Sequence, residues 1–195
     1  AYTLFKRDPE AQMIVTPSDH LVLNEVDFLS LVEECVGFAT QHDALMTIGI
    51  QPNRPETGYG YIQKSNSEPI SRVKCFTEKP NAELAQAFVE CGEFLWNSGI
   101  FLWSIPSIRK SFETLLPEMA NKFKQGTEVY GTPREQAFID EIYPLCHNIS
   151  IDYGIMEKAP NVYVLCSDFG WSDLGTWGSL YDLSPKDENR NVSNR

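Results

Sequence analysis

The stretch FTEKPNAELAQAFVECGEFLWNSGIFLW, residues 76–103, holds two short polar motifs at the ends of apolar runs. The first, FTEKP at 76–80, indicates a strand end that presents a carboxylate and an ammonium before a proline. In the second, WNSGIF at 96–101, the amide of Asn97 interrupts an apolar run. These groups suit a ligand with both hydroxyls and a phosphate. Taken singly, the motifs are more typical of a surface ion pair and a backbone-bonded asparagine.

Composition limits the classes of protein that this chain can represent. Its 195 residues, 42% of them hydrophobic, suffice for one domain with a substantial core. The formal net charge of −11 argues against a nucleic-acid partner, and no apolar run approaches the ~20 residues that span a bilayer. The five cysteines include no Cys-x-x-Cys pair, which favours reduced thiols in a cytoplasmic protein over a disulfide scaffold or a zinc site.

Outward from this stretch, local patterns predict alternating strands and helices. Short apolar runs predict strands at 13–16, 45–50, 59–63, 72–79, 94–103 and 162–166. Helical spacing predicts helices at 2–7, 27–39, 82–91, 105–116, most of 117–143 and from 176 to about 183. Asp27 and Thr176 are the expected caps of two of these helices.

These elements predict one α/β domain over residues 1–195, with a frayed polar end at 184–195. We expect strand 13–16 to be buried on both faces. The strand–helix–strand order from 13 to 50 predicts a right-handed parallel crossover.

Six motifs occur in a fixed order along nearly the whole chain. They are PSDH at 17–20, PETGYGYI at 55–62, FTEKP, WNSGIF, DYGIMEK at 152–158 and WSDLGTW at 171–177. With this set the chain resembles the mannose-1-phosphate guanylyltransferases, within the sugar nucleotidyltransferases. The resemblance implies a Rossmann-like α/β fold with a mixed, mostly parallel sheet flanked by helices. The family's glycine-rich nucleotide loop, Gly-x-Gly-Thr-Arg-Leu in type, does not occur here, so we expect a catalytic domain incomplete at its N-terminus, without its first strand or strands.

The resemblance implies a magnesium site. Asp19 follows the predicted strand 13–16, and Asp173 lies in the turn of the last motif. By their match to the family's motifs these two aspartates would bind Mg²⁺, the implied cofactor, and with Lys79 they form the implied catalytic set. Magnesium prefers one or two carboxylates together with phosphate oxygens and water. Without the resemblance, each aspartate is more typical of a turn or a helix cap.

The resemblance also implies a sugar-phosphate site. Lys79 would face the phosphate, with Lys158 beside it. The sugar would be held by four groups, which are Glu78, Asn97, Glu157 and the backbone of Gly60. The alternative for residues 157 and 158 is a solvated helical charge pair. The three histidines lack metal-ligand spacing, so we expect structural roles for them.

The implied reaction makes GDP-mannose and pyrophosphate from mannose-1-phosphate and GTP. Two alternatives stay open, a non-catalytic module that binds sugar phosphates or nucleotide sugars, and a sister enzyme that transfers thymidylyl or uridylyl groups to glucose-1-phosphate. The missing glycine loop would wrap a triphosphate with backbone amides. We therefore expect little or no transferase activity from these 195 residues. We also expect an apolar sheet edge that favours a homo-oligomer.

Overall fold

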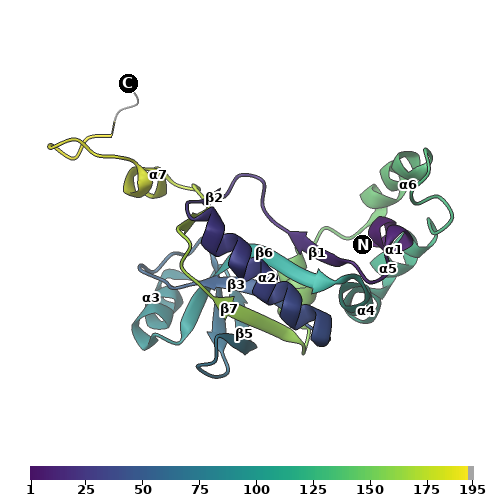
Figure 1. The fold of residues 1–195 in the computed structure, drawn as a ribbon, viewed down its shortest axis with the longest axis horizontal. Coiled ribbons are helices and arrows are strands. Elements are labelled where there is room, and N and C mark those ends of the chain that lie inside the picture. Colours follow the sequence, from purple (N-terminus) through teal and green to yellow (C-terminus); the bar gives the residue numbers. More distant parts are fainter. Residues whose placement is uncertain (193–195) are drawn as a thin grey trace.

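A six-stranded sheet, in the order β1-β6-β3-β7-β5-β4, organises the computed structural model, which describes residues 1–192 (Figure 1). Its strands are β1 (Gln12–Val15), β3 (Leu45–Ile50), β4 (Gly60–Lys64), β5 (Ile70–Glu78), β6 (Phe94–Ser104) and β7 (Val162–Cys166). The first part of β6 also pairs with β4. A separate two-stranded sheet joins β2 (Leu21–Val22) to β8 (Trp171–Ser172).

The directions of the strands correct one part of the expected fold. The mixed α/β sheet flanked by helices is confirmed, but the sheet is not mostly parallel, because β3–β7 is the one parallel pairing among its described strands. The strands β1 and β3, which the first crossover joins, are both antiparallel to β6, which lies between them. The short connection at 65–69 forces β4 and β5 to be antiparallel, since a parallel return needs a dozen or more residues.

The strand β1 departs from the expected burial on both faces. Ile14 is 43% and Val15 37% exposed, because within residues 1–192 β1 pairs only with β6 and forms an edge. By contrast, every residue of β3 is buried. The apolar edge at β1 favours the expected self-association, which stays a prediction.

Several helices begin directly after a polar residue whose side chain caps them. Helix α2 (Glu25–Gln41) crosses one face of the sheet (Figure 1) and begins at Asn24, whose side chain accepts from the backbone N–H of Asp27. The expected cap at Asp27 was therefore wrong, because the cap lies three residues earlier. Helix α3 (Ala82–Cys91) has its predicted bounds, and Thr176 caps α7 (Trp177–Leu183) as predicted.

The remaining helices gather at one end of the molecule, opposite α7 (Figure 1). They are α1 (Tyr2–Arg7), α4 (Ile105–Leu115), α5 (Pro117–Lys124) and α6 (Glu135–Ile142). A 3₁₀ turn follows at Tyr143–Leu145, and a single π-helical turn at Asp152–Met156. The expected frayed end at 184–195 stays a prediction, and its residues 193–195 lie outside the described part.

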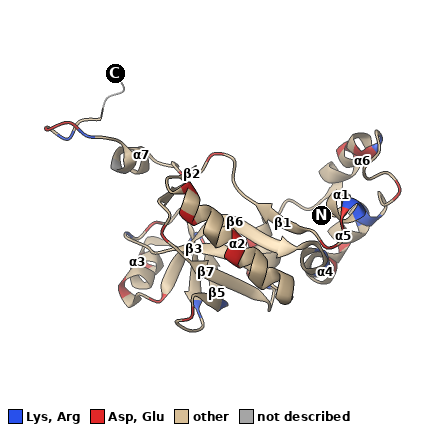
Figure 2. Cartoon of the chain, viewed as in Figure 1, with Lys and Arg blue, Asp and Glu red and all other residues tan. Residues whose placement is uncertain are grey.

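Charged side chains are spread over the helices. Acidic residues mark α2, α3 and α6, and basic residues gather at α1 (Figure 2). No helix among residues 1–192 is long and apolar enough to cross a bilayer.

Candidate active site

A cavity of about 190 Å³ lies where the start of β4, the end of β5 and the interior of β6 meet the π-helical turn and the turn after β8. Five of the residues expected in the site line this cavity, and they are Gly60, Glu78, Lys79, Asn97 and Asp173. Asp152 lines it too. The structure thus brings together groups that are far apart in the sequence.

Gly60 lets a glutamate enter the cavity. It lies directly opposite Glu78 in the β4–β5 pairing, and a Cβ at position 60 would lie 2.5 Å from Glu78 Oε2. Any larger residue would displace that carboxylate. The side chain of Glu78 is only 10% exposed and forms an ion pair with Lys79, with Nζ 3.4 Å from Oε1.

Lys79 has an unusual backbone for a residue other than glycine. Its φ of 47° lies in the left-handed region, which side chains with a Cβ rarely adopt. Its N–H donates to the carbonyl oxygen of Tyr59 at 3.2 Å, which ties the end of β5 to the segment before β4. Its side chain is 62% exposed, so the ammonium group is accessible to a ligand. Strained conformations of this kind often occur at functional sites.

Most hydrogen-bonding positions of the Asn97 amide are already occupied by other groups of the protein. Its Oδ1 accepts from the Thr47 hydroxyl at 2.8 Å and the Gly99 N–H at 3.4 Å, and its Nδ2 donates to Asp152 Oδ1 at 3.1 Å. The amide therefore orients Asp152 and keeps one N–H hydrogen for a ligand. The sequence analysis missed Asp152, although it opens the DYGIMEK motif that supplied two of the expected residues.

Two carboxylates of the cavity, Glu78 and Asp152, lie close together, and a third, Glu157, lies beside them. Burial, followed by the negative charge of Asp152, raises the pKa of Glu78. Burial also raises the pKa of Asp152, against the hydrogen bond from Asn97. Glu157 approaches from the π-helical turn, where its Oε1 accepts from the N–H of Glu78 at 3.4 Å. Crowded, partly desolvated carboxylates of this kind are strong acceptors for the hydroxyl groups of a ligand.

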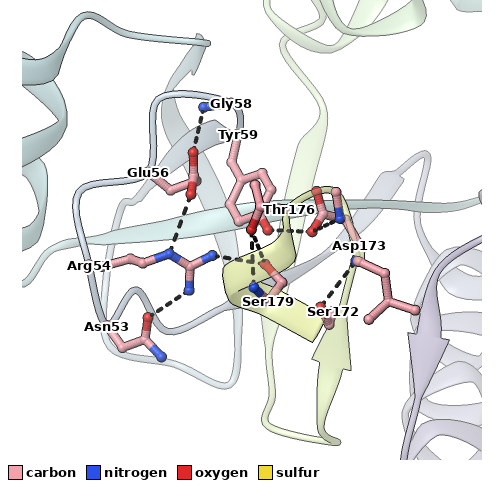
Figure 3. A network of polar contacts seen from close by, with 11 residues as sticks. Asn53, Arg54, Glu56, Gly58, Tyr59, Ser172, Asp173, Thr176 and Ser179 are labelled. Carbon is pink, nitrogen blue, oxygen red and sulfur yellow. Dashed lines mark hydrogen bonds and ion pairs between the residues drawn. The ribbon is translucent and has the colours of Figure 1, made fainter. Parts of the chain in front are cut away.

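Asp173 is held by two donors on a single oxygen (Figure 3). Its Oδ1 accepts from the Tyr59 hydroxyl at 2.6 Å and from the Gly175 N–H at 3.1 Å. Burial, followed by the bond to Asp173, raises the pKa of Tyr59. Tyr59 was also missed, because its importance depends on a contact with a residue 114 positions away.

Three expected residues do not line the cavity. They are Asp19, Glu157 and Lys158, and all three are exposed. The neighbour of Asp19, His20, does line it, and its Nδ1 accepts from Trp171 Nε1 at 3.2 Å. The histidine that we expected to be structural therefore also contributes to the cavity.

Of the two aspartates expected to bind a divalent cation, Asp173 lines the cavity and Asp19 does not. Among residues 1–192 there is no group of three or more His, Cys, Asp or Glu side chains that could hold a metal ion. Magnesium, however, needs only one or two carboxylates beside phosphate oxygens and water. Within the described part of the chain, Oδ2 of Asp173 accepts no hydrogen bond, so this oxygen suits such a ligand role.

Comparisons with known proteins identify the family of this chain. The profile of the family described as "Nucleotidyl transferase" matches residues 1–190. The chain is 38% identical over 189 residues to the mannose-1-phosphate guanylyltransferase of Escherichia coli, covering 92% of the chain and 40% of that protein. It is 37% identical to the protein of that name from Sinorhizobium fredii, covering 94% of the chain and 36% of that protein. The chain thus spans about 40% of the length of these relatives.

Solved structures share the fold. A structure described as mannose-1-phosphate geranyltransferase from Thermus thermophilus matches with a TM-score of 0.82 and 28% identity, over 93% of this chain and 52% of that one. A mannose-6-phosphate isomerase from Helicobacter pylori matches with a TM-score of 0.72 and 23% identity, over 88% of this chain and 67% of that one. The second likeness concerns the fold alone.

Proposed function

The chain belongs to the nucleotidyl transferase family, and on that premise we propose that its cavity binds mannose-1-phosphate for guanylyl transfer from GTP. The products would be GDP-mannose and pyrophosphate. The observation that carries the proposal is the convergence of Lys79 with Glu78, Asp152 and Asn97 in one cavity. We also propose a cytoplasmic location, which the five free cysteines support.

The residues in and beside the cavity would contact different parts of the ligand. Glu78, Asp152 and Glu157 accept hydrogen bonds from the sugar hydroxyls, and the remaining Asn97 N–H donates to one of them. The exposed ammonium of Lys79 binds the phosphate by exchanging its long contact with Glu78 for a charge-assisted hydrogen bond.

Phosphoryl chemistry needs mainly positioning and charge neutralisation from the protein. An oxygen of the sugar phosphate attacks the α-phosphorus of GTP, and pyrophosphate leaves in line. Lys79 would hold the attacking phosphate and offset part of its charge. Asp173 is the cavity residue that would hold a magnesium ion, which would supply further charge neutralisation. A role for Asp19 stays a prediction from the resemblance.

Calorimetric titration with mannose-1-phosphate in magnesium buffer tests the acceptor site. Lys79→Ala is expected to weaken binding about 10-fold or more, because a charge-assisted contact to phosphate is lost. Lys74→Ala is the matched control, since Lys74 is an exposed lysine of the same strand that does not line the cavity. Its affinity should equal that of the wild type.

The same titration separates the alternatives. Equal binding of glucose-1-phosphate would favour the sister enzymes, and no binding by the folded wild type would refute the proposed acceptor site. Pyrophosphate release from GTP and mannose-1-phosphate tests the expectation drawn from the missing glycine loop. Little release from these 195 residues would agree with it, and robust release would contradict it.

A further inference from the structure

We propose that Tyr59 is a positioning residue for Asp173. Its hydroxyl holds one carboxylate oxygen, so that the other stays available for a divalent cation in the cavity. This role of Tyr59 does not depend on which sugar phosphate binds beside the cation. Only the identity of that sugar phosphate rests on the proposed function.

The carboxylate of Asp173 is fixed by its two donors. The Tyr59 hydroxyl and the Gly175 N–H both point to Oδ1, at 2.6 Å and 3.1 Å (Figure 3). The turn that aims the N–H of Gly175 depends on Leu174, which has a φ of 52° and donates its own N–H to Ser172 Oγ at 3.1 Å. Rotation of the carboxylate would break both bonds to Oδ1. Fixed supporting bonds of this kind orient carboxylate ligands of metal ions.

Tyr59 is itself held on several sides. Its ring makes edge contacts with Trp96, at 5.1 Å between centroids, and with Trp171, at 5.4 Å. Its carbonyl oxygen accepts from the N–H of Lys79 at 3.2 Å. Because aromatic contacts and a backbone bond restrict the ring, the hydroxyl is presented in one place.

A second contact joins the same two segments. The guanidinium of Arg54 lies 3.3 Å from Glu56 Oε2 and donates to Ser179 Oγ at 3.5 Å, across the gap to α7 (Figure 3). The segment before β4 and the segment after β8 are therefore connected twice, once through Asp173 and once through Ser179. These two contacts hold Tyr59 and Asp173 next to each other.

Titration of the chain with Mn²⁺ alone, followed by water-proton relaxation, tests the role of Tyr59. Tyr59→Phe removes the hydroxyl but keeps the ring contacts, and it should weaken Mn²⁺ binding about 10-fold. Tyr61→Phe is the matched control, because Tyr61 lies in the adjacent β4, is fully buried and does not line the cavity. Its Mn²⁺ affinity should equal that of the wild type.

A double-mutant cycle shows whether the effect passes through Asp173. Asp173→Asn should remove most of the Mn²⁺ binding, and Tyr59→Phe in that background should cause no further loss. Equal affinity of wild type and Tyr59→Phe, no Mn²⁺ binding by the wild type, or independent effects in the cycle would each overturn the inference. Unfolding of Tyr59→Phe in metal-free buffer would also overturn it, since a positioning residue affects affinity rather than folding.

The outcome stays separate from that of the proposed function. A chain that shows the expected Mn²⁺ behaviour but binds no mannose-1-phosphate would keep the role of Tyr59 and refute the proposed acceptor. With mannose-1-phosphate as the ligand, Tyr59→Phe should weaken binding in magnesium buffer and leave binding in EDTA unchanged.

Discussion

Two walls of the cavity hold their carboxylates in different ways. The acidic wall is formed by Glu78 and Asp152, with the exposed Glu157 beside them, and burial raises the pKa of Glu78 and Asp152. The tyrosine wall, formed by Tyr59 and Asp173, fixes one carboxylate with two donors on the same oxygen. The first wall therefore brings carboxylates close to one another, and the second has a carboxylate oriented by two donors on one oxygen.

The difference suggests a division of labour between binding and orientation. Desolvated carboxylates destabilise the free protein, and the hydroxyl groups of a ligand can relieve that cost. A carboxylate held by fixed donors needs little reorganisation when a cation arrives. The following substitutions test the two walls separately.

Gly60→Ala should break the acidic wall and have the largest effect. A Cβ at position 60 would lie 2.5 Å from Glu78 Oε2 and 3.3 Å from Asn97 Cβ, so the glutamate must move. We expect about a 100-fold loss of affinity for mannose-1-phosphate in calorimetry, as small displacements of binding groups can cause. Gly37→Ala is the control, because its Cβ would meet nothing within 4 Å. Unchanged affinity of Gly60→Ala would show that the position of Glu78 does not matter.

Glu78→Gln should lower the affinity for the sugar phosphate and raise the free energy of unfolding near neutral pH. Because burial raises the pKa of Glu78, the folded chain holds this proton more tightly than the unfolded chain does. The free energy of unfolding of the wild type therefore falls as the pH rises from the ordinary glutamate pKa through the raised value. In the glutamine variant this fall is absent, so near neutral pH it should be more stable by about 1 kcal/mol, while sugar-phosphate affinity drops about 10-fold.

Urea unfolding on the acid side of that pH window and near neutral pH measures the effect. Glu68→Gln, at an exposed position, should follow the wild type at both pH values. A Glu78→Gln variant that loses stability near neutral pH would mean that the ion pair with Lys79 outweighs the cost of burial.

Thr176→Ala should have the smallest effect on the cavity and sharpens the comparison at the tyrosine wall. Thr176 Oγ1 accepts from the N–H of Ser179 at 3.0 Å and caps α7. Its loss should cost about 1 kcal/mol in unfolding free energy, with little change in Mn²⁺ affinity. Thr176→Ser keeps the cap and should match the wild type in urea unfolding. A large loss of Mn²⁺ affinity in the alanine variant would mean that α7, and not Tyr59 alone, orients Asp173.

Local sequence signals predicted the elements better than their pairing. Helix α3 and strand β7 occupy their predicted residues, since caps and apolar runs depend on neighbours within a few positions. The prediction of a mostly parallel sheet was wrong. The strands that pair with β6 lie far from it in the sequence, and the residue pattern within one strand does not indicate the direction of its partner. The edge position of β1 was missed for the same reason.

The motifs predicted only some of the residues that line the cavity. Five of the expected residues converge there, whereas Asp19, Glu157 and Lys158 remain exposed outside it. A motif identifies a segment at a strand end, but the turn geometry of the folded chain decides which of its side chains enters the cavity. At PSDH the cavity receives His20 instead of its neighbour.

The sequence by itself determined the mixed α/β class, most of the elements and the motif set that leads to the family. These features depend on the order of residues and on interactions within one helix or strand. The tertiary structure alone decided the strand directions and the roles of Asp152 and Tyr59. Asp152 meets Asn97 across 55 positions, and Tyr59 meets Asp173 across 114. Contacts at such separations arise only when the whole sheet packs, because no local pattern of residues encodes which distant side chain will be the partner.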